Sequence, residues 1–214
     1  MFANRELVRK VANRVRAAAR ETLEDLVSTR VQHETQFTDR FLGNLQHQLN
    51  GKTIAGVRWR VKTLTDRVAR SQEREFGADF IAALDVEMEE FSVKKGFLAQ
   101  AKRVEPSERF RSSESSRLRE QCKKMLKHTP DSFVFLYSAQ SGVTVVPAIE
   151  VLGARDCNPH ELTNRPVAQF FGDHLDCFVG DPKIRAADVA QLETLRADYA
   201  ARALLALEGR VVGG

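Results

Sequence analysis

Two stretches near the N-terminus have the apolar spacing of amphipathic helices. Between Arg5 and about Arg30, apolar side chains recur at helical spacing while arginine and glutamate fill the opposite face, and the stretch from about Gln32 to Leu49 has a similar stripe. Asn50-Gly51 is expected to end the second helix, because glycine readily adopts the left-handed conformation that follows many helices. The pattern therefore predicts N-terminal helices over residues 5–49.

The middle of the chain has the pattern of a β-hairpin. Two apolar segments, Ala78–Val86 and Gly96–Lys102, are predicted to be strands, and the charged run Glu87–Lys95 between them is predicted to be turn-like. About ten residues between the strands are too few for a helical crossover, so the strands should pair antiparallel. We expect a hairpin over about residues 77–104, whereas residues 52–70 are typical of either strand or loop.

The rest of the chain alternates between helix and strand patterns. A helix is expected from about Ser112 to Pro130, and Ser132–Ser138 is the nearly continuous apolar run of a strand buried on both faces. The chain is expected to turn and return as a strand over Val143–Val146. A short helix is predicted over residues 166–178 and a last helix over about 186–207.

This interleaving of strands and helices predicts an α/β fold with a mixed sheet. No repeat, linker or low-complexity tract divides the sequence, so residues 1–214 are interpreted as one domain that contains the N-terminal helices, the hairpin and the C-terminal helix. No apolar stretch approaches the roughly 18 residues of a membrane span. The basic N-terminus also lacks the apolar core of a secretion signal. We therefore expect neither membrane insertion nor secretion.

Cysteine content and net charge bear on the cellular compartment and the partners of the protein. The three cysteines form neither a disulfide framework nor a C-x-x-C site, so we interpret them as reduced thiols of a cytoplasmic protein. Cys177 precedes Phe178-Val179 and is expected to be a small buried hydrophobic residue. Lys and Arg outnumber Asp and Glu by 33 to 29, and this net charge of +4 permits a nucleic-acid partner without requiring one. The histidines lack metal-ligand spacing and are expected at the surface or at helix caps: His33, His47, His128, His160 and His174.

Three polar side chains belong to the expected hairpin. Alternate residues of a strand share a face, so Gln100 and Lys102 should point the same way while Ala101 points into packing. Pairing Asp79 with the neighbourhood of Ala101 places the hairpin turn near residue 90. We therefore expect a carboxylate, an amide and an ammonium group to converge at the sheet edge.

Such a cluster suits the hydrolysis of phosphodiester bonds. A carboxylate and a neutral oxygen can hold Mg²⁺, which keeps several waters. The metal lowers the pKa of a bound water and neutralises charge on the phosphate. Lys102 would orient or help deprotonate that water and would stabilise the transition state. The alternative interpretations are a solvated edge-strand lysine at Lys102 and a surface amide at Gln100.

At these residues the sequence resembles the PD-(D/E)xK nuclease superfamily. Its motif is an acid on one hairpin strand, followed on the next strand by Asp, Glu or sometimes Gln, one spacer and Lys. Gly77-Ala78-Asp79-Phe80 and Gln100-Ala101-Lys102 carry this pattern. The family also tends to have a glutamate on the helix before the hairpin, a position that Glu34 fits, with a helix-surface charge as the alternative. The resemblance covers roughly residues 32–146.

The resemblance implies a fold, an activity and a cofactor. The fold would be the three-layer α/β/α restriction-endonuclease-like fold with a central mixed sheet. The activity would be Mg²⁺- or Mn²⁺-dependent endonuclease cleavage of DNA, as in nuclease domains of bacterial antiphage effectors. Asp79, Gln100 and Glu34 would bind the metal, and Lys102 would complete the catalytic set. Gln100 replaces the commoner acid and Ala78 replaces the motif's proline, so metal affinity should depend on Asp79 and Glu34.

The resemblance also suggests partners. Double-stranded DNA is the expected substrate, and cutting both strands favours a homodimer or higher oligomer because one site hydrolyses one strand. Related effectors are often fused to a sensor domain. For this protein, a separate sensor protein is the alternative to such a fused domain. Arg103, Arg109 and Arg111 follow the catalytic strand and are candidates to contact a DNA backbone. Two other functions stay open: an inactive nuclease-fold subunit that binds nucleic acid or a partner protein, and an RNA-cleaving effector.

Overall fold

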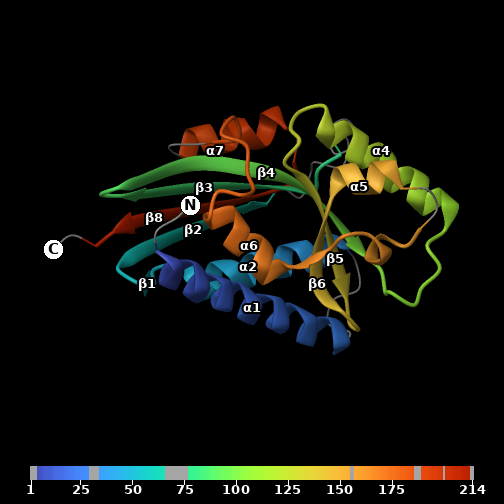
Figure 1. Cartoon of the computed structure of the whole chain (residues 1–214), viewed down its shortest axis with the longest axis horizontal. Helices are drawn as coiled ribbons and strands as arrows, with labels where there is room; N and C mark the ends of the chain where they lie inside the picture. The colour runs from blue at the N-terminus through green and yellow to red at the C-terminus, as the bar shows by residue number, and fades with distance from the viewer. Residues whose placement is uncertain are drawn as a thin grey trace.

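Helices lie on both faces of one sheet in the computed structural model of the chain (Figure 1). The structure describes residues 4–28, 34–65, 77–154, 157–185, 189–199 and 201–212. The elements within these residues are α1 (Arg5–Val27), α2 (Glu34–Leu49), β1 (Thr53–Ile54), β2 (Val57–Thr65), β3 (Phe80–Met88), β4 (Phe91–Arg103), α4 (Ser112–Leu126), β5 (Ser132–Ser138), β6 (Gly142–Pro147), α5 (Ala148–Gly153), the short 3₁₀ helix η2 (Pro159–Glu161), β7 (Arg165–Pro166), α6 (Val167–Leu175), α7 (Val189–Asp198) and β8 (Ala203–Val211).

The strands of the described residues form one mixed sheet of 8 strands in the order β1-β2-β8-β3-β4-β5-β6-β7. β3 runs parallel to β8 and β4 runs parallel to β5, whereas every other neighbouring pair is antiparallel. The expected α/β class with a mixed sheet is therefore confirmed.

Each face of the sheet carries its own apolar core. On one face, α1, α2 and α6 pack against the rings of Phe80, Phe97 and Phe135. On the other face, α4, α5 and α7 pack against Leu98, Val134 and neighbouring side chains. Because successive strand residues point to opposite faces, the apolar runs of β3, β4 and β5 supply both cores at once.

The expected hairpin is formed by β3 and β4, but its turn is much shorter than predicted. The ladder runs from Phe80 opposite Ala99 to Met88 opposite Phe91, so only Glu89-Glu90 lie between the strands. The charged run belongs mostly to the ladder because opposite charges face one another across it: Lys94 Nζ lies 3.1 Å from Asp85 Oδ2. The register also differs by one residue from the prediction.

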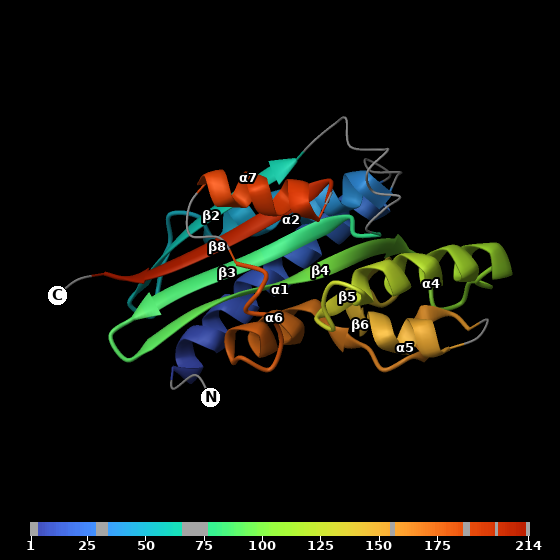
Figure 2. The same ribbon diagram turned by 90° about the horizontal axis from the view of Figure 1, so that it is seen from above.

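The predicted helix over about 186–207 is wrong in its second half. α7 ends at Asp198, and Ala203–Val211 is a strand, β8, that lies between β2 and β3 (Figure 2). The side chains of Leu204 and Leu205 are fully buried and belong to the two different cores. An apolar run buried on both sides has no helical or alternating signature, so hydrogen bonding to the distant strands decides its structure.

Other predicted segments agree more closely with the structure. The run Ser132–Ser138 is β5 with the predicted bounds, and α4 and α6 fall within their predicted ranges. The ambiguous stretch after Gly51 contains β1 and β2, and residues 66–70 of it lie outside the described residues. Within the described residues, no helix has both the length and the apolar character needed to cross a membrane.

Candidate metal and catalytic site

The position of Asp79 depends on the two small residues before it. Gly77 has a φ of 78°, and a Cβ at this position would lie 2.5 Å from the Gln121 backbone oxygen of α4. Glycine therefore satisfies both the left-handed backbone and the close approach to α4. The Asp79 amide donates to Ala99 O at 2.8 Å, and Asp79 O accepts from Ala203 N at 3.1 Å. These bonds fix Asp79 between β4 and β8.

The Asp79 carboxylate meets Gln100 and the backbone of β4. Gln100 Nε2 donates to Asp79 Oδ2 at 2.5 Å, and the Ala101 amide donates to the same oxygen at 2.8 Å. The carboxylate thus supplies the acceptor for a backbone amide of β4 beyond the end of the β3 ladder. Gln100 is only 4% exposed, so its side chain is not a surface amide. Its alternation with Ala99 and Ala101, which belong to the core beneath α2, is as predicted.

Lys102 and Glu34 form a second pair beside the first. Lys102 Nζ lies 2.8 Å from Glu34 Oε1, and the Arg103 amide donates to the same oxygen at 3.4 Å. Lys102 pairs with Leu136 of β5 beyond the end of the β3 ladder, and its side chain is only 18% exposed, so it is not a solvated lysine. Glu34 lies in the first turn of α2, where the helix dipole favours a carboxylate.

The sequence did not point to Arg202, which joins the elements of this site. Its Nη1 donates to Asp39 Oδ1 at 2.6 Å and its Nη2 donates to Thr35 O at 3.2 Å, both in α2. The next residue, Ala203, is hydrogen-bonded to Asp79. Arg202 therefore ties the first turns of α2, which carry Glu34, to the strand beside Asp79. No local pattern could have revealed this, because the contact requires β8 to lie next to β3.

Tyr137 of β5 is a second residue that the sequence did not single out. Its side chain is fully buried and stacks on Phe37 with ring centroids 5.9 Å apart. Burial raises the pKa of the Tyr137 phenol well above its usual range, and the nearby Asp79 carboxylate raises it further. The phenol is therefore a neutral group close to the candidate site.

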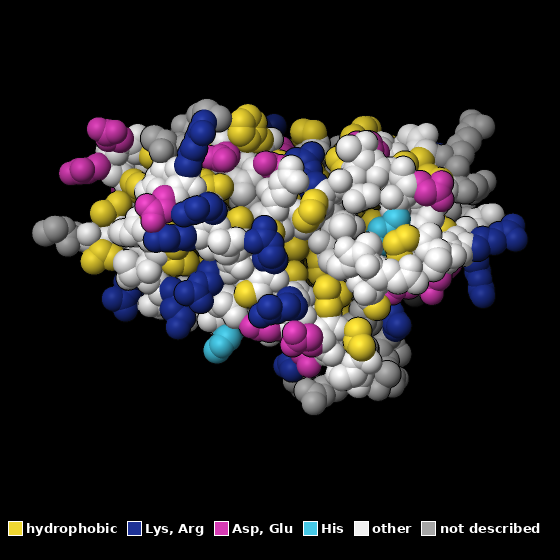
Figure 3. All heavy atoms as spheres, turned by 60° about the horizontal axis from the view of Figure 1, so that its bottom comes forward, with side chains coloured by type: hydrophobic (Ala, Val, Ile, Leu, Met, Phe, Trp, Pro, Cys, Tyr) yellow, Lys and Arg dark blue, Asp and Glu magenta, His cyan; other side chains and the backbone are white. Residues whose placement is uncertain are grey.

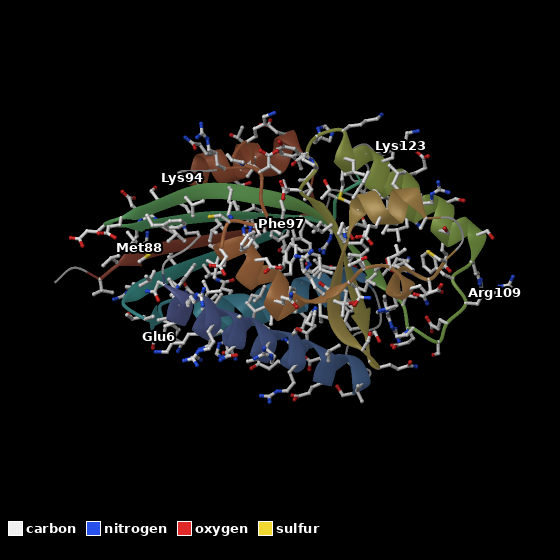
Figure 4. All side chains as sticks on the ribbon, viewed as in Figure 1. Glu6, Met88, Lys94, Phe97, Arg109 and Lys123 are labelled. Carbon is white, nitrogen blue, oxygen red and sulfur yellow. The ribbon has the colours of Figure 1, made fainter. Side chains whose placement is uncertain are left out.

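The three arginines proposed to contact DNA do not form one cluster. The Arg103 guanidinium lies over the Phe37 ring, 5.7 Å from its centroid. Arg109 and Arg111 are exposed in the segment between β4 and α4, and Figure 4 places Arg109 at the outer end of the molecule. A larger group of cations covers the α1 side of the molecule (Figure 3). The exposed cations of α1 are Arg5, Arg9, Lys10, Arg14, Arg16 and Arg20.

Two oxygens beside the Gln100 amide are of a type that hard divalent cations bind. Asp79 Oδ2 and Ala101 O lie 2.5 Å and 3.2 Å from the same atom, Gln100 Nε2, so two acceptors converge on one point. Carboxylate, amide and backbone oxygens are the ligands that Mg²⁺ accepts together with water. Among the described residues, no three His, Cys, Asp or Glu side chains gather at one place. The described residues therefore bring one carboxylate, that of Asp79, to this place beside the oxygens of Gln100 and Ala101.

Two expectations about other titratable residues are wrong. His174 was expected at the surface or at a helix cap but is fully buried, and Cys177 was expected to be buried but is exposed. α6 is short and tightly packed, so its last turn turns His174 inward while the residue after its C-cap faces outward. His47 and His128 are exposed as expected, and His33 lies outside the described residues.

A comparison of this chain with models of known protein families, with curated proteins and with solved structures found no match.

Proposed function

We propose that this chain is a metal-dependent endonuclease that hydrolyses DNA phosphodiester bonds on a restriction-endonuclease-like scaffold of the PD-(D/E)xK type. One observation carries the proposal: Asp79 and Gln100 are in hydrogen-bond contact at the end of a hairpin, with Lys102 two residues further along the same strand. The salt bridge from Lys102 to Glu34 adds the glutamate of the preceding helix. Bacterial antiphage defence is the proposed setting.

In this proposal, Asp79, Gln100 and the Ala101 carbonyl would hold Mg²⁺ or Mn²⁺. When bound, the metal would supply a more acidic water and would neutralise charge on the phosphate. Gln100 presents its NH₂ group to Asp79, so its amide would turn to offer oxygen to a cation. A cation would therefore have to displace this hydrogen bond, which lowers its affinity for the site.

Lys102 would act on the phosphate and on the attacking water. Its side chain is only 18% exposed, and a charge in partly buried surroundings interacts with a phosphate more strongly than one in water. Glu34, which was expected to bind the metal, would instead hold this ammonium in position, because Lys102 Nζ lies 2.8 Å from its Oε1. Arg202 would act indirectly, because it fixes the first turns of α2 and does not contact the reacting groups.

A cleavage assay on supercoiled plasmid tests this proposal. With Mg²⁺ or Mn²⁺ the wild-type protein should nick the plasmid, and EDTA should stop the reaction. Lys102→Met and Asp79→Asn should each lower the rate about 10²–10³-fold, the usual effect of losing a group that stabilises the transition state. Lys94→Met is the matched control, because Lys94 pairs with Asp85 elsewhere on the hairpin (Figure 4). Undiminished cleavage by both site variants would refute the assignment.

One observation favours a second function, an inactive nuclease-fold subunit that binds nucleic acid or a partner protein. Position 100 contributes an amide and Glu34 is engaged by Lys102, so within the described part of the chain Asp79 is the one carboxylate left to bind a metal here. The exposed cations of α1 would then supply binding to phosphates. DNA binding that survives EDTA, with no cleavage of DNA or RNA under any divalent metal, would select this function. RNA cleavage without DNA cleavage would select an RNA-cleaving effector instead.

A further inference from the structure

The exposed side of α1 carries a line of arginines. Successive residues of a helix are turned by about 100° around its axis, which places four exposed arginines within an arc of about 60°: Arg5, Arg9, Arg16 and Arg20. At a rise of about 1.5 Å per residue, this arginine stripe is about 22 Å long. The stripe has a fixed support, because the opposite side of α1 is buried against α2 and α6. Figure 3 shows the cations gathered over this side of the molecule.

The order of charges along α1 opposes the stability of the helix. The N-terminal end of a helix favours acidic side chains, and its C-terminal end favours cations. The first two turns of α1 hold Arg5, Arg9 and Lys10 with a single acid, Glu6, and its last turn has no basic residue. Arg5 and Arg9 are also four residues apart, a spacing at which like charges repel. A helix that departs from these rules without a gain in stability indicates a function for its charges.

The stripe has few counter-ions within the described part of the chain. The acid of the first turn, Glu6, is engaged by Lys10, whose Nζ lies 2.7 Å from its Oε1. Arg5 and Arg9 form no ion pair or hydrogen bond with the described residues. Arg16 donates to a neutral amide oxygen of a neighbouring residue. These three arginines therefore have no carboxylate of the described residues within ion-pair distance.

A straight line of unpaired arginines fits a linear polyanion. An arginine can bind phosphate oxygens through two N–H groups at once. Each strand of a DNA duplex places one phosphate per about 3.4 Å of axis, so the stripe is as long as about six phosphates. Every exposed residue between Arg5 and Glu24 is polar. This part of α1 therefore exposes no apolar side chain to insert into a membrane and no aromatic ring on which an unpaired base could stack.

We propose that the arginine stripe of α1 binds the phosphate backbone of a DNA duplex, without a metal ion and without preference for base sequence. The stripe is a binding surface separate from the candidate metal site. The inference rests on the proposed function only in choosing DNA as the polyanion. Four phosphate contacts predict that the logarithm of the association constant falls against the logarithm of the salt concentration with a slope of about −3.6.

The test is the titration of a fluorescent DNA duplex of about 20 base pairs with the full chain, in EDTA and at several salt concentrations. The double variant Arg9→Gln, Arg16→Gln should bind about 10–100-fold more weakly near 0.1 M salt, and its slope should be smaller by about 2. Arg117→Gln, Lys123→Gln is the matched control. It removes two exposed cations from α4, on the other face of the sheet (Figure 4), and should bind as the wild-type chain does.

Three results would overturn the inference. An equal loss of affinity in the two double variants would show that binding follows net charge and not the stripe. Tighter binding of a single-stranded oligonucleotide, or binding of phosphatidylserine vesicles without binding of the duplex, would assign the stripe to another partner. A lower melting temperature of Arg9→Gln, Arg16→Gln than of the wild-type chain would show that the arginines support the fold, since relief of their repulsion should leave it unchanged or raise it.

The same variants separate this inference from the proposed function. Plasmid cleavage by a chain whose duplex affinity does not change in Arg9→Gln, Arg16→Gln would refute the role of the stripe and leave the endonuclease in place. Duplex binding that depends on the stripe, with no cleavage under any divalent metal, would refute the endonuclease and support the stripe.

Discussion

Replacing Gly77 by alanine should destabilise the fold more than the same change at Gly51, Gly56 or Gly142, where an added Cβ would have no atom closer than 3.7 Å. The left-handed backbone alone costs a non-glycine residue about 1–2 kcal/mol. The new Cβ would also lie 2.5 Å from the Gln121 backbone oxygen and 2.9 Å from the Gln121 Cα. Backbone atoms of a helix cannot turn aside as a flexible side chain can, so overpacking should add about 1–3 kcal/mol.

Gly51→Ala provides the matched control. Gly51 also has a positive φ of 72°, but nothing lies within 4 Å of the position that its Cβ would occupy. Gly51→Ala should therefore show the backbone cost alone. In urea unfolding followed by circular dichroism, Gly77→Ala should have the lower midpoint, by about 1 M at an unchanged slope. Identical midpoints for the two variants would refute the proposed contact with α4.

Three further changes test other parts of the structure. His174 is charged below about pH 6.5 when unfolded but stays neutral to about pH 3 when folded, so its protonation favours the unfolded chain in that window. The free energy of unfolding should fall by up to about 1.4 kcal/mol for each pH unit below 6.5, and His174→Leu should flatten this slope in urea titrations at several pH values. Arg202→Met should cost about 1–3 kcal/mol, because it leaves Asp39 and Thr35 O without their donors; an unchanged melting temperature would contradict the role given to this arginine. Gln100→Glu places a second carboxylate against Asp79, so the melting temperature should fall in EDTA and rise on adding Mg²⁺ by more than it does for wild type. A variant that does not respond to the metal would argue against a cation site at this place.

Much of the fold could be predicted because its signals are local. The continuous apolar run of β5 and the helical stripe of α4 are each fully visible within their own residues. The hairpin was predictable from the spacing between its strands, but its short turn was not. The charged residues Asp85 and Lys94 resemble turn residues in the sequence, and their place in the strands is explained only by the ion pair that they form across the ladder.

In the candidate site, too, some residues could be predicted from local sequence signals and others could not. Asp79, Gln100 and Lys102 were predictable because strand alternation and antiparallel pairing bring them to one end of the hairpin. Arg202 was not, because its segment reads as helix until it is known to lie between β2 and β3. The exposure of Cys177 escaped prediction for a related reason: its backbone has a φ of 67°, a conformation that its sequence does not favour.

The position of β8 has a consequence for how the chain is made. Residues 57–65 and 80–88 are close in sequence, yet they join the same sheet only through a strand that begins at Ala203. As the ribosome releases the chain from its N-terminal end, β2 and β3 must each wait with one unpaired edge until β8 emerges. The nascent polypeptide therefore carries two unpaired strand edges for most of its synthesis. A chaperone that shields these edges from pairing with other chains should raise the yield of folded protein.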